Sequence, residues 1–482
     1  MTSPPAPSAG QSSSSGLAAA PLVDACPLSD GHQTRNIRIF ATSVALVYLG
    51  SPVLYVGITL PALCKRLDAS DAVSNLPSTA YFLGTLAPLL VAWFFPYVRL
   101  LKPVLTATYS ILGLGGAVLA TVLAMYRSED QNALVISLVV AYALLAGASL
   151  QVISTFLWEA VGRGVSESRR GRALGLAFGL GPVLAVVGAL GQQLVLQGEV
   201  QLPTFNFTSG ISSTRVAIAS TVFPWNFAVL FAATVPLMAL AAVLSTRFVV
   251  PMPSVEVVRQ PFLAGVFGGI GKLLVDRITR IAVIATILIF AGAMIVGNVS
   301  LYAKTALGAP VDQYVGYQNA LRFGFKIVAG LALGWLLTRT NPKAGMIFTG
   351  FLCLAGVIWA GVSEGWWYLL SFGLLGAGEL YGVYYPNYIL SCSSPSKMRR
   401  NMAIANMLPM VASPAGMMYG AVSDRFGYHA SFSASLCIIV ATLLLVMLML
   451  PRRPTPRAEE MDASDLAVAS PPPVASTSAQ RG

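Results

Sequence analysis

Residues 314–337 read YVGYQNALRFGFKIVAGLALGWLL, an apolar segment long enough to cross a bilayer as a helix. The segment nevertheless contains Arg322 and Lys326, and a cation at membrane depth costs roughly 2.5–3.5 kcal/mol on insertion scales. Gln318, Arg322 and Lys326 recur every four residues, so they share one helical face, with Asn319 beside them. One polar face on an otherwise apolar helix indicates an interior cavity that the rest of the chain surrounds.

A cation near a helix end can instead extend its side chain to the lipid headgroups. Lys326 stands near the middle of the segment, however, and Arg322 is only about 6 Å of helical rise away. We therefore favour the interpretation that at least one of them faces the cavity. There it would hold an anionic group, for which arginine offers a bidentate fork.

The composition indicates a membrane protein. The 482 residues are 56% hydrophobic and only 10% charged, whereas soluble domains are about 25% charged. The net charge of +11 fits the positive-inside rule, so we expect no nucleic-acid partner. The five cysteines are scattered and, with only two histidines, match no metal site or disulfide framework. We also expect no cofactor, because the chain has no phosphate-binding loop and no catalytic constellation, and hence no enzyme activity.

The fold class predicted is an all-α polytopic membrane protein with twelve transmembrane helices. The expected spans lie near 39–63, 78–98, 103–126, 132–158, 173–197, 223–247, 279–303, 314–337, 344–362, 366–391, 402–422 and 430–450.

The interval between the sixth and seventh spans divides the chain into halves. Within it, residues 262–277 place apolar side chains at helical spacing, which predicts an amphipathic helix on the membrane surface. The predicted organisation is a disordered cytoplasmic tail (1–36), an N-terminal six-helix bundle (37–250), a cytoplasmic linker with that helix (251–278), a C-terminal six-helix bundle (279–451) and a second disordered tail (452–482).

The loop charges predict the orientation. Most of the 30 lysines and arginines fall in the two tails and in alternate loops. Since cytoplasmic loops carry the excess of positive charge, we expect both termini in the cytoplasm and the protein in the cell (inner) membrane.

Two loop sequences carry a resemblance to a known family. The segment GWLLTRTNPK (Gly334–Lys343) is similar to the helix 8–9 loop motif of the major facilitator superfamily, with Thr338 where that family usually has an aspartate. The loop AWFFPYVRLLK (Ala92–Lys102) is its more degenerate counterpart in the first half. GLAFGLGP (Gly175–Pro182) resembles the Gly-Pro motif of drug/proton antiporters, but the paired glycines that should follow are absent. The resemblance implies two six-helix bundles that work by alternating access.

Glu379 is the acid that stands near the centre of its span. One interpretation makes it a fixed counter-ion of Arg322 or Lys326, and the other makes it a proton-coupling site whose charge depends on the bound substrate. Both need the same geometry, so the sequence leaves them open. Two cations against one acid favour a substrate with a negative charge.

Other polar side chains in apolar spans extend the predicted pocket into both halves. Glu159 lies close to the cytoplasmic end of its span, so we interpret it as a gate residue that pairs with Arg163 or Arg172. The predicted substrate-binding set is Arg322, Lys326, Gln318, Asn298, Tyr302, Gln151, Tyr48, Tyr55 and Asn387.

These features together predict a monomeric secondary transporter in the lipid bilayer. It would carry a small polar, anionic organic solute, with a proton as the candidate coupling ion. A membrane sensor or scaffold that binds a solute without moving it is the alternative from another class. Neither the solute nor the direction of transport follows from the sequence.

Overall fold

The computed structural model describes residues 28–206, 210–219, 221–251, 271, 274–392 and 398–454. Most of the surface helix expected at 262–277 and most of both tails lie outside these residues. The first helix begins at Asp30, inside the stretch predicted as a tail. Long-range contacts account for this early start, since the buried Asn36 side chain donates to the carbonyl oxygens of Gly164 and Val249.

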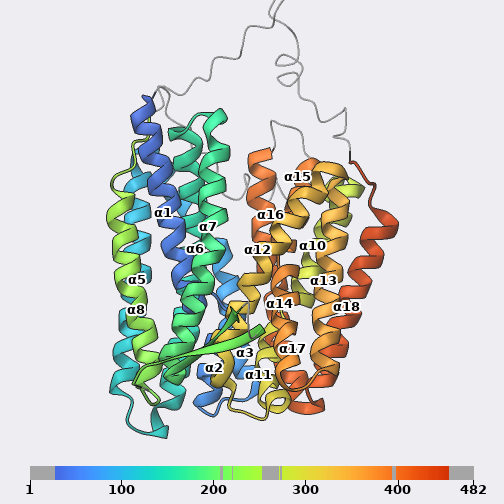
Figure 1. The fold of residues 1–482 in the computed structure, drawn as a ribbon. Coiled ribbons are helices and arrows are strands. Elements are labelled where there is room, and N and C mark those ends of the chain that lie inside the picture. The colour runs from blue at the N-terminus through green and yellow to red at the C-terminus, as the bar shows by residue number, and fades with distance from the viewer. Residues whose placement is uncertain are drawn as a thin grey trace, which may run out of the picture.

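The fold is predominantly helical, as the sequence predicts, and Figure 1 shows two groups of helices side by side. The first group contains α1 (Asp30–Leu54), α2 (Thr59–Arg66), α3 (Asp71–Leu83), α4 (Ala87–Phe94), α5 (Leu101–Met125), α6 (Asn132–Gly164), α7 (Glu167–Gln197) and α8 (Trp225–Ser245). The second contains α10 (Arg277–Ala293), α11 (Val296–Leu307), α12 (Val315–Arg339), α13 (Pro342–Val362), α14 (Leu370–Gly378), α15 (Tyr381–Ser391), α16 (Met398–Ala412), α17 (Pro414–Phe426) and α18 (Tyr428–Met449).

Ten helical segments of the described part are long and apolar enough to cross a membrane. The spans expected at 366–391 and 402–422 are not among the ten, although both are helical. The first is divided into α14 and α15 at Glu379 and Leu380. The second is divided into α16 and α17 at Ser413, between two prolines that each lack a backbone donor.

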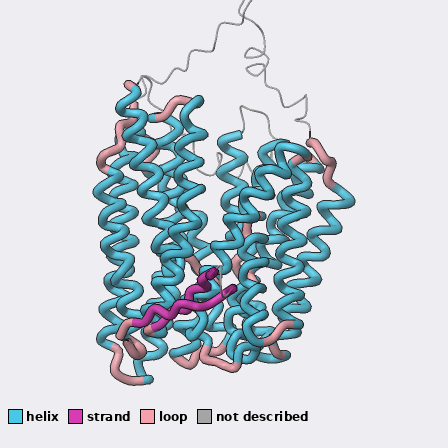
Figure 2. Tube along the Cα trace, viewed as in Figure 1, coloured by secondary structure: helices cyan, strands magenta, loops and turns pink. Residues whose placement is uncertain are grey.

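A small antiparallel hairpin, which the sequence analysis did not predict, joins α7 to α8. It pairs β1 (Glu199–Asn206) with β2 (Gly210–Ala217), in a register that sets Glu199 opposite Ala217 and Asn206 opposite Gly210. The hairpin crosses the lower part of the molecule in Figure 2. The backbone N–H of Gln201 donates to the hydroxyl of Tyr317 at 2.6 Å, which ties the hairpin to α12.

The two groups of helices are joined at the end where α2 meets α3. At this end α3 packs against α17, and α7 packs against α12. The polar contacts that the structure gives between the groups gather at this end and at mid-height. They include Asp424 with Asp71 and Ala72, Asn75 with Asn298, Thr79 with Ser413, Arg66 with Asp312, and Gln193 with Gln313 and Gly316.

Candidate functional site

Arg322 contacts both groups of helices from the middle of α12. Its Nε donates to Oε1 of Glu379 at 2.6 Å, and its Nη1 donates to the carbonyl oxygen of Val56 at 3.1 Å. Lys326, one turn further along α12, forms an ion pair with Oε2 of the same glutamate. Two cations therefore share one carboxylate, which leaves the cluster with a formal charge of +1.

The polar face of α12 is turned into the molecule. The Arg322 and Lys326 side chains are 11% and 19% exposed and that of Glu379 is 13% exposed, whereas Val328 and Leu331 on the other faces are 69% and 75% exposed. An apolar outer face is what a helix in contact with lipid requires. The cations thus lie against protein, with a small part of each accessible.

Two interrupted helices supply the partners of Arg322. Val56 lies between the end of α1 and the start of α2, where Gly57 has a φ of +114° that only glycine adopts without strain. A carbonyl freed by such a break needs a donor when it is buried, and the guanidinium provides one. Glu379 stands at the corresponding break between α14 and α15. Broken helices at the level of a charged group are typical of solute and ion sites in transporters.

A chain of hydrogen bonds extends the site into the first group of helices. The Asn319 side chain donates to Oε1 of Gln192 at 3.0 Å, and Gln192 donates to the hydroxyl of Thr59 at 2.8 Å. Thr59 in turn donates to the carbonyl oxygen of Pro52, in the last turn of α1. This chain holds α12 against both α7 and the break between α1 and α2.

Gln318 lies on the same face of α12, one turn before Arg322, and is fully buried. Its Oε1 accepts a hydrogen bond from Ser300 at 2.9 Å. Its Nε2 has no partner within the described part of the chain. A buried amide donor without a partner costs about 1–3 kcal/mol, so this group is available to a ligand or a water molecule.

The structure places Asn298 in a buried hydrogen-bond network and Tyr302 in an aromatic cluster, whereas the sequence predicted both in the wall of the pocket. Asn298 is fully buried, where it accepts from Asn75 of α3 at 2.7 Å and donates to Ser423 at 2.6 Å. The ring of Tyr302 packs among aromatic side chains of the second group, and its hydroxyl lies 3.3 Å from Nε2 of His429. Both residues lie towards the end where α2 meets α3 and the two groups of helices are joined, which we call the closed end.

The remaining predicted binding residues lie at different distances from the charged cluster. Tyr55 is close, because its ring centroid is 6.5 Å from that of Phe323, which follows Arg322 on α12. Tyr48 is half-buried on α1 and faces α7 at Gly181. Gln151 on α6 is half-buried and Asn387 on α15 is exposed.

The predicted gate pair forms within a single helix. Nε of Arg163 donates to Oε1 of Glu159 at 2.8 Å, one turn apart on α6, and both side chains are partly exposed. This ion pair therefore lies within the first group of helices.

Two polar contacts between the groups of helices, at the end where α2 meets α3, could not be predicted from the sequence. Asp424 accepts from the backbone N–H groups of Asp71 and Ala72, each at 2.9 Å, so a carboxylate of α17 caps the N-terminus of α3. Arg66 and Asp312 form an ion pair at 3.0 Å. Asp424 and Arg66 lie in the last turns of α17 and α2, and Asp312 lies in the short turn before α12. Only their long-range partners distinguish them from ordinary solvated charges.

Comparisons with known proteins show which solved structures share this fold. No family model matches the chain, and no curated protein matches it by sequence. Solved structures do match. The crystal structure of nucleoside transporter NupG has a TM-score of 0.58 at 11% identity, covering 86% of this chain and 97% of that one. The D-xylose-proton symporter has a TM-score of 0.61 at 13% identity, covering 87% and 98%. The chain thus has a fold of the major facilitator type, as the resemblance implied, without a specific subfamily.

Proposed function

We propose that this chain is a secondary transporter that moves a small anionic organic solute by alternating access. The observation that carries the proposal is the cluster of Arg322, Lys326 and Glu379, two cations that share one acid at a break in two helices. The structural neighbours support transport as the activity, since one is a nucleoside transporter and one a D-xylose-proton symporter. The charge of the solute is argued from this chain's own residues.

The cluster suggests how an anion and a proton would be coupled. With Glu379 ionised, its two oxygens occupy Arg322 and Lys326, which leaves neither cation free for a substrate. Protonation of Glu379 removes that competition, so the guanidinium fork and the ammonium can bind a carboxylate or phosphate of the solute. Proton binding and anion binding then favour each other, as linkage requires. Gln318 and Tyr55 are the nearest predicted residues to contact the rest of the solute.

Arg322 also connects solute binding to the movement of the two halves. It donates to Glu379 in its own half and to Val56 in the other. An anion that draws the guanidinium away from Val56 would break one contact between the two groups of helices at the end where α2 meets α3. The contacts of Asn298 and Asp424 would still keep the two groups together at that end. With both termini cytoplasmic, the closed end is the outer one and the conformation is inward-facing. Glu159 and Arg163 remain our candidates for the opposite, inner gate, together with Gln151, Tyr48 and Asn387 along the path.

A stability screen followed by counterflow tests the proposal. Purified protein is heated with lactate, succinate, gluconate or adenosine monophosphate, and with neutral xylose and adenosine for comparison, since a ligand of the folded state raises the Tm. We expect at least one anion to stabilise the protein and to exchange across proteoliposomes. Stabilisation by the neutral compounds alone would overturn the anion assignment. Binding without counterflow would favour a sensor that does not transport.

A further inference from the structure

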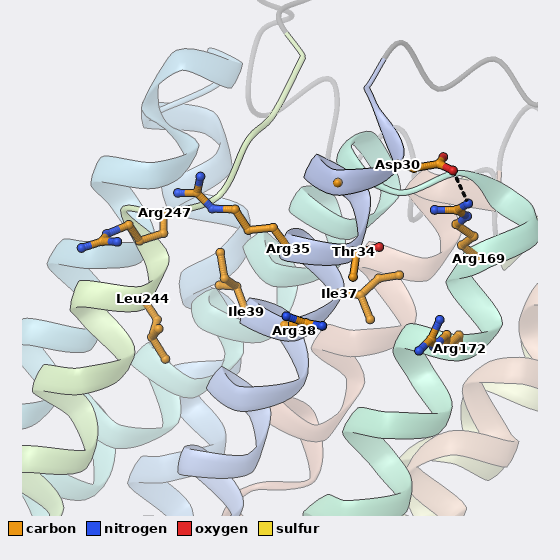
Figure 3. A pocket seen from close by; sticks show the side chains of 11 residues that line it. Asp30, Thr34, Arg35, Ile37, Arg38, Ile39, Arg169, Arg172, Leu244 and Arg247 are labelled. Carbon is orange, nitrogen blue, oxygen red and sulfur yellow. Dashed lines mark ion pairs between the residues drawn. The ribbon is translucent and has the colours of Figure 1, made fainter.

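A second basic site lies at the open end of the first group of helices, far along the chain from the charged cluster of α12. A cavity of about 770 Å³ opens beside the first turns of α1, with α7 and α8 on either side. Figure 3 shows arginine side chains around it from α1, from α7 and from the residues that follow α8. The five are Arg35, Arg38, Arg169, Arg172 and Arg247.

The positive charge of this cavity is largely uncompensated. Asp30 is the acid that lines it, and its carboxylate pairs with Arg169 at 2.9 Å. Within the described part of the chain, Arg35, Arg38, Arg172 and Arg247 have no ion pair with a carboxylate. Like charges gathered at one site repel each other, and a bound anion would offset that repulsion. The cavity therefore has the electrostatic character of an anion site.

The position of the arginines favours a lipid as the source of the anion. Arg172 directly precedes the apolar run of α7, and Arg247 follows the apolar helix α8, so both stand at the boundary between polar and apolar sequence. The cavity is also lined by Ile37, Ile39 and Leu244, and the two isoleucines flank Arg38 on α1. Guanidinium groups next to apolar side chains match a phospholipid, with its phosphate on the arginines and an acyl chain along the apolar side chains.

We propose that this cavity binds the phosphate group of an anionic phospholipid from the adjacent leaflet. Arginine suits the task because its planar fork makes paired hydrogen bonds to phosphate oxygens. Arg38 and Arg172 lie deeper along α1 and α7 than Arg35 and Arg169 and are the principal ligands. The site is separate from Arg322, so its occupancy does not depend on the transport proposal.

The test measures the Tm of the purified full chain in neutral detergent with added dioctanoyl phosphatidic acid. Dioctanoyl phosphatidylcholine and inorganic phosphate are the comparison ligands. We expect a concentration-dependent rise in Tm with phosphatidic acid. In Arg38→Gln/Arg172→Gln, the lipid concentration for half of the rise should increase at least tenfold. Arg452→Gln/Arg453→Gln removes the same charge from the second group of helices and should respond like the wild type.

The outcomes separate the specific site from general attraction. An equal loss of response in both double variants would overturn the proposal, as would an equal rise in Tm with phosphatidylcholine. A full rise with inorganic phosphate alone would assign the site to a soluble anion instead of a lipid. Arg38→Lys/Arg172→Lys keeps both positive charges but lacks the planar guanidinium. It therefore controls for the possibility that Arg38→Gln/Arg172→Gln loses the response because it misfolds. It should retain only part of the response.

Discussion

The guanidinium of Arg322 joins two breaks in two different helices, because it donates both to Glu379 Oε1 at 2.6 Å and to the Val56 carbonyl at 3.1 Å. A guanidinium holds both partners at once because its Nε and Nη1 donors point in different, fixed directions. The residue thus links the candidate anion site to the contact between the two halves of the molecule.

We predict that Arg322→Lys weakens anion binding about 10- to 100-fold. The variant keeps the charge but loses the fork, and a hydrogen bond to a charged group contributes about 1.5–3 kcal/mol. Titration of the anion found in the stability screen measures the effect. Arg339→Lys, at the end of the same helix, is the matched control and should bind normally. Unchanged anion affinity in Arg322→Lys would show that bidentate binding by the guanidinium is not needed.

Glu379→Gln should separate exchange from accumulation. The amide imitates the protonated acid, so Arg322 and Lys326 stay available and counterflow of the anion should persist. Accumulation driven by a pH gradient should be lost, because no group at the site then binds and releases a proton. Both activities are measured in the same proteoliposomes. Loss of folded protein in this variant would instead favour Glu379 as a fixed structural counter-ion.

Gly57→Ala should affect the site as well as the stability. A side chain at φ of +114° is strained, and a Cβ there would lie 3.5 Å from Nη1 of Arg322 and 3.3 Å from Cγ1 of Val296. Gly308→Ala is the matched control, since Gly308 has a φ of +63° and nothing within 4 Å of its Cβ position. We expect each variant to lose about 1–2 kcal/mol of stability. Only Gly57→Ala should also weaken anion binding.

Asp424→Ala should favour opening of the closed end. The change removes the carboxylate that caps α3 from the other half and leaves two backbone donors without it. Spin labels at Ser128 and Glu364, one in each half at this end, would report the change by electron–electron distance measurement. We expect a longer distance to appear beside the wild-type one. Glu129→Ala, an exposed loop acid at the same end, should leave the distribution unchanged, and identical spectra for both variants would refute the role of the cap.

The sequence identified the side chains of the charged cluster but not their backbone partners. The four-residue steps from Gln318 to Lys326 revealed a polar face, and a buried cation requires an acid such as Glu379. The carbonyl of Val56 leaves no trace in a side-chain pattern, because it becomes an acceptor only where α1 ends. A polar residue in an apolar span can line a cavity or belong to a buried hydrogen-bond network, and the sequence alone does not distinguish the two. Asn298 illustrates this, since its partners come from α3, α17 and α18.

The hairpin and the helix start have similar explanations. The sequence predicts residues 199–217 only as part of a connection between spans, and the backbone N–H of Gln201 donates to the hydroxyl of Tyr317, far along the chain. The polar start of α1 was predicted as part of a tail, yet Asn36 finds buried partners far along the chain at Gly164 and Val249. Long-range partners decide such cases, and a single sequence does not show them.

Proton uptake during anion binding tests the central claim most directly. Calorimetry in buffers of different ionisation enthalpy measures how many protons the protein takes up as the anion binds. The account predicts net uptake by the wild type, tighter binding as the pH falls, and neither effect in Glu379→Gln. Binding that takes up no proton and does not depend on pH in the wild type would contradict the coupling of Glu379 to the solute at Arg322 and Lys326.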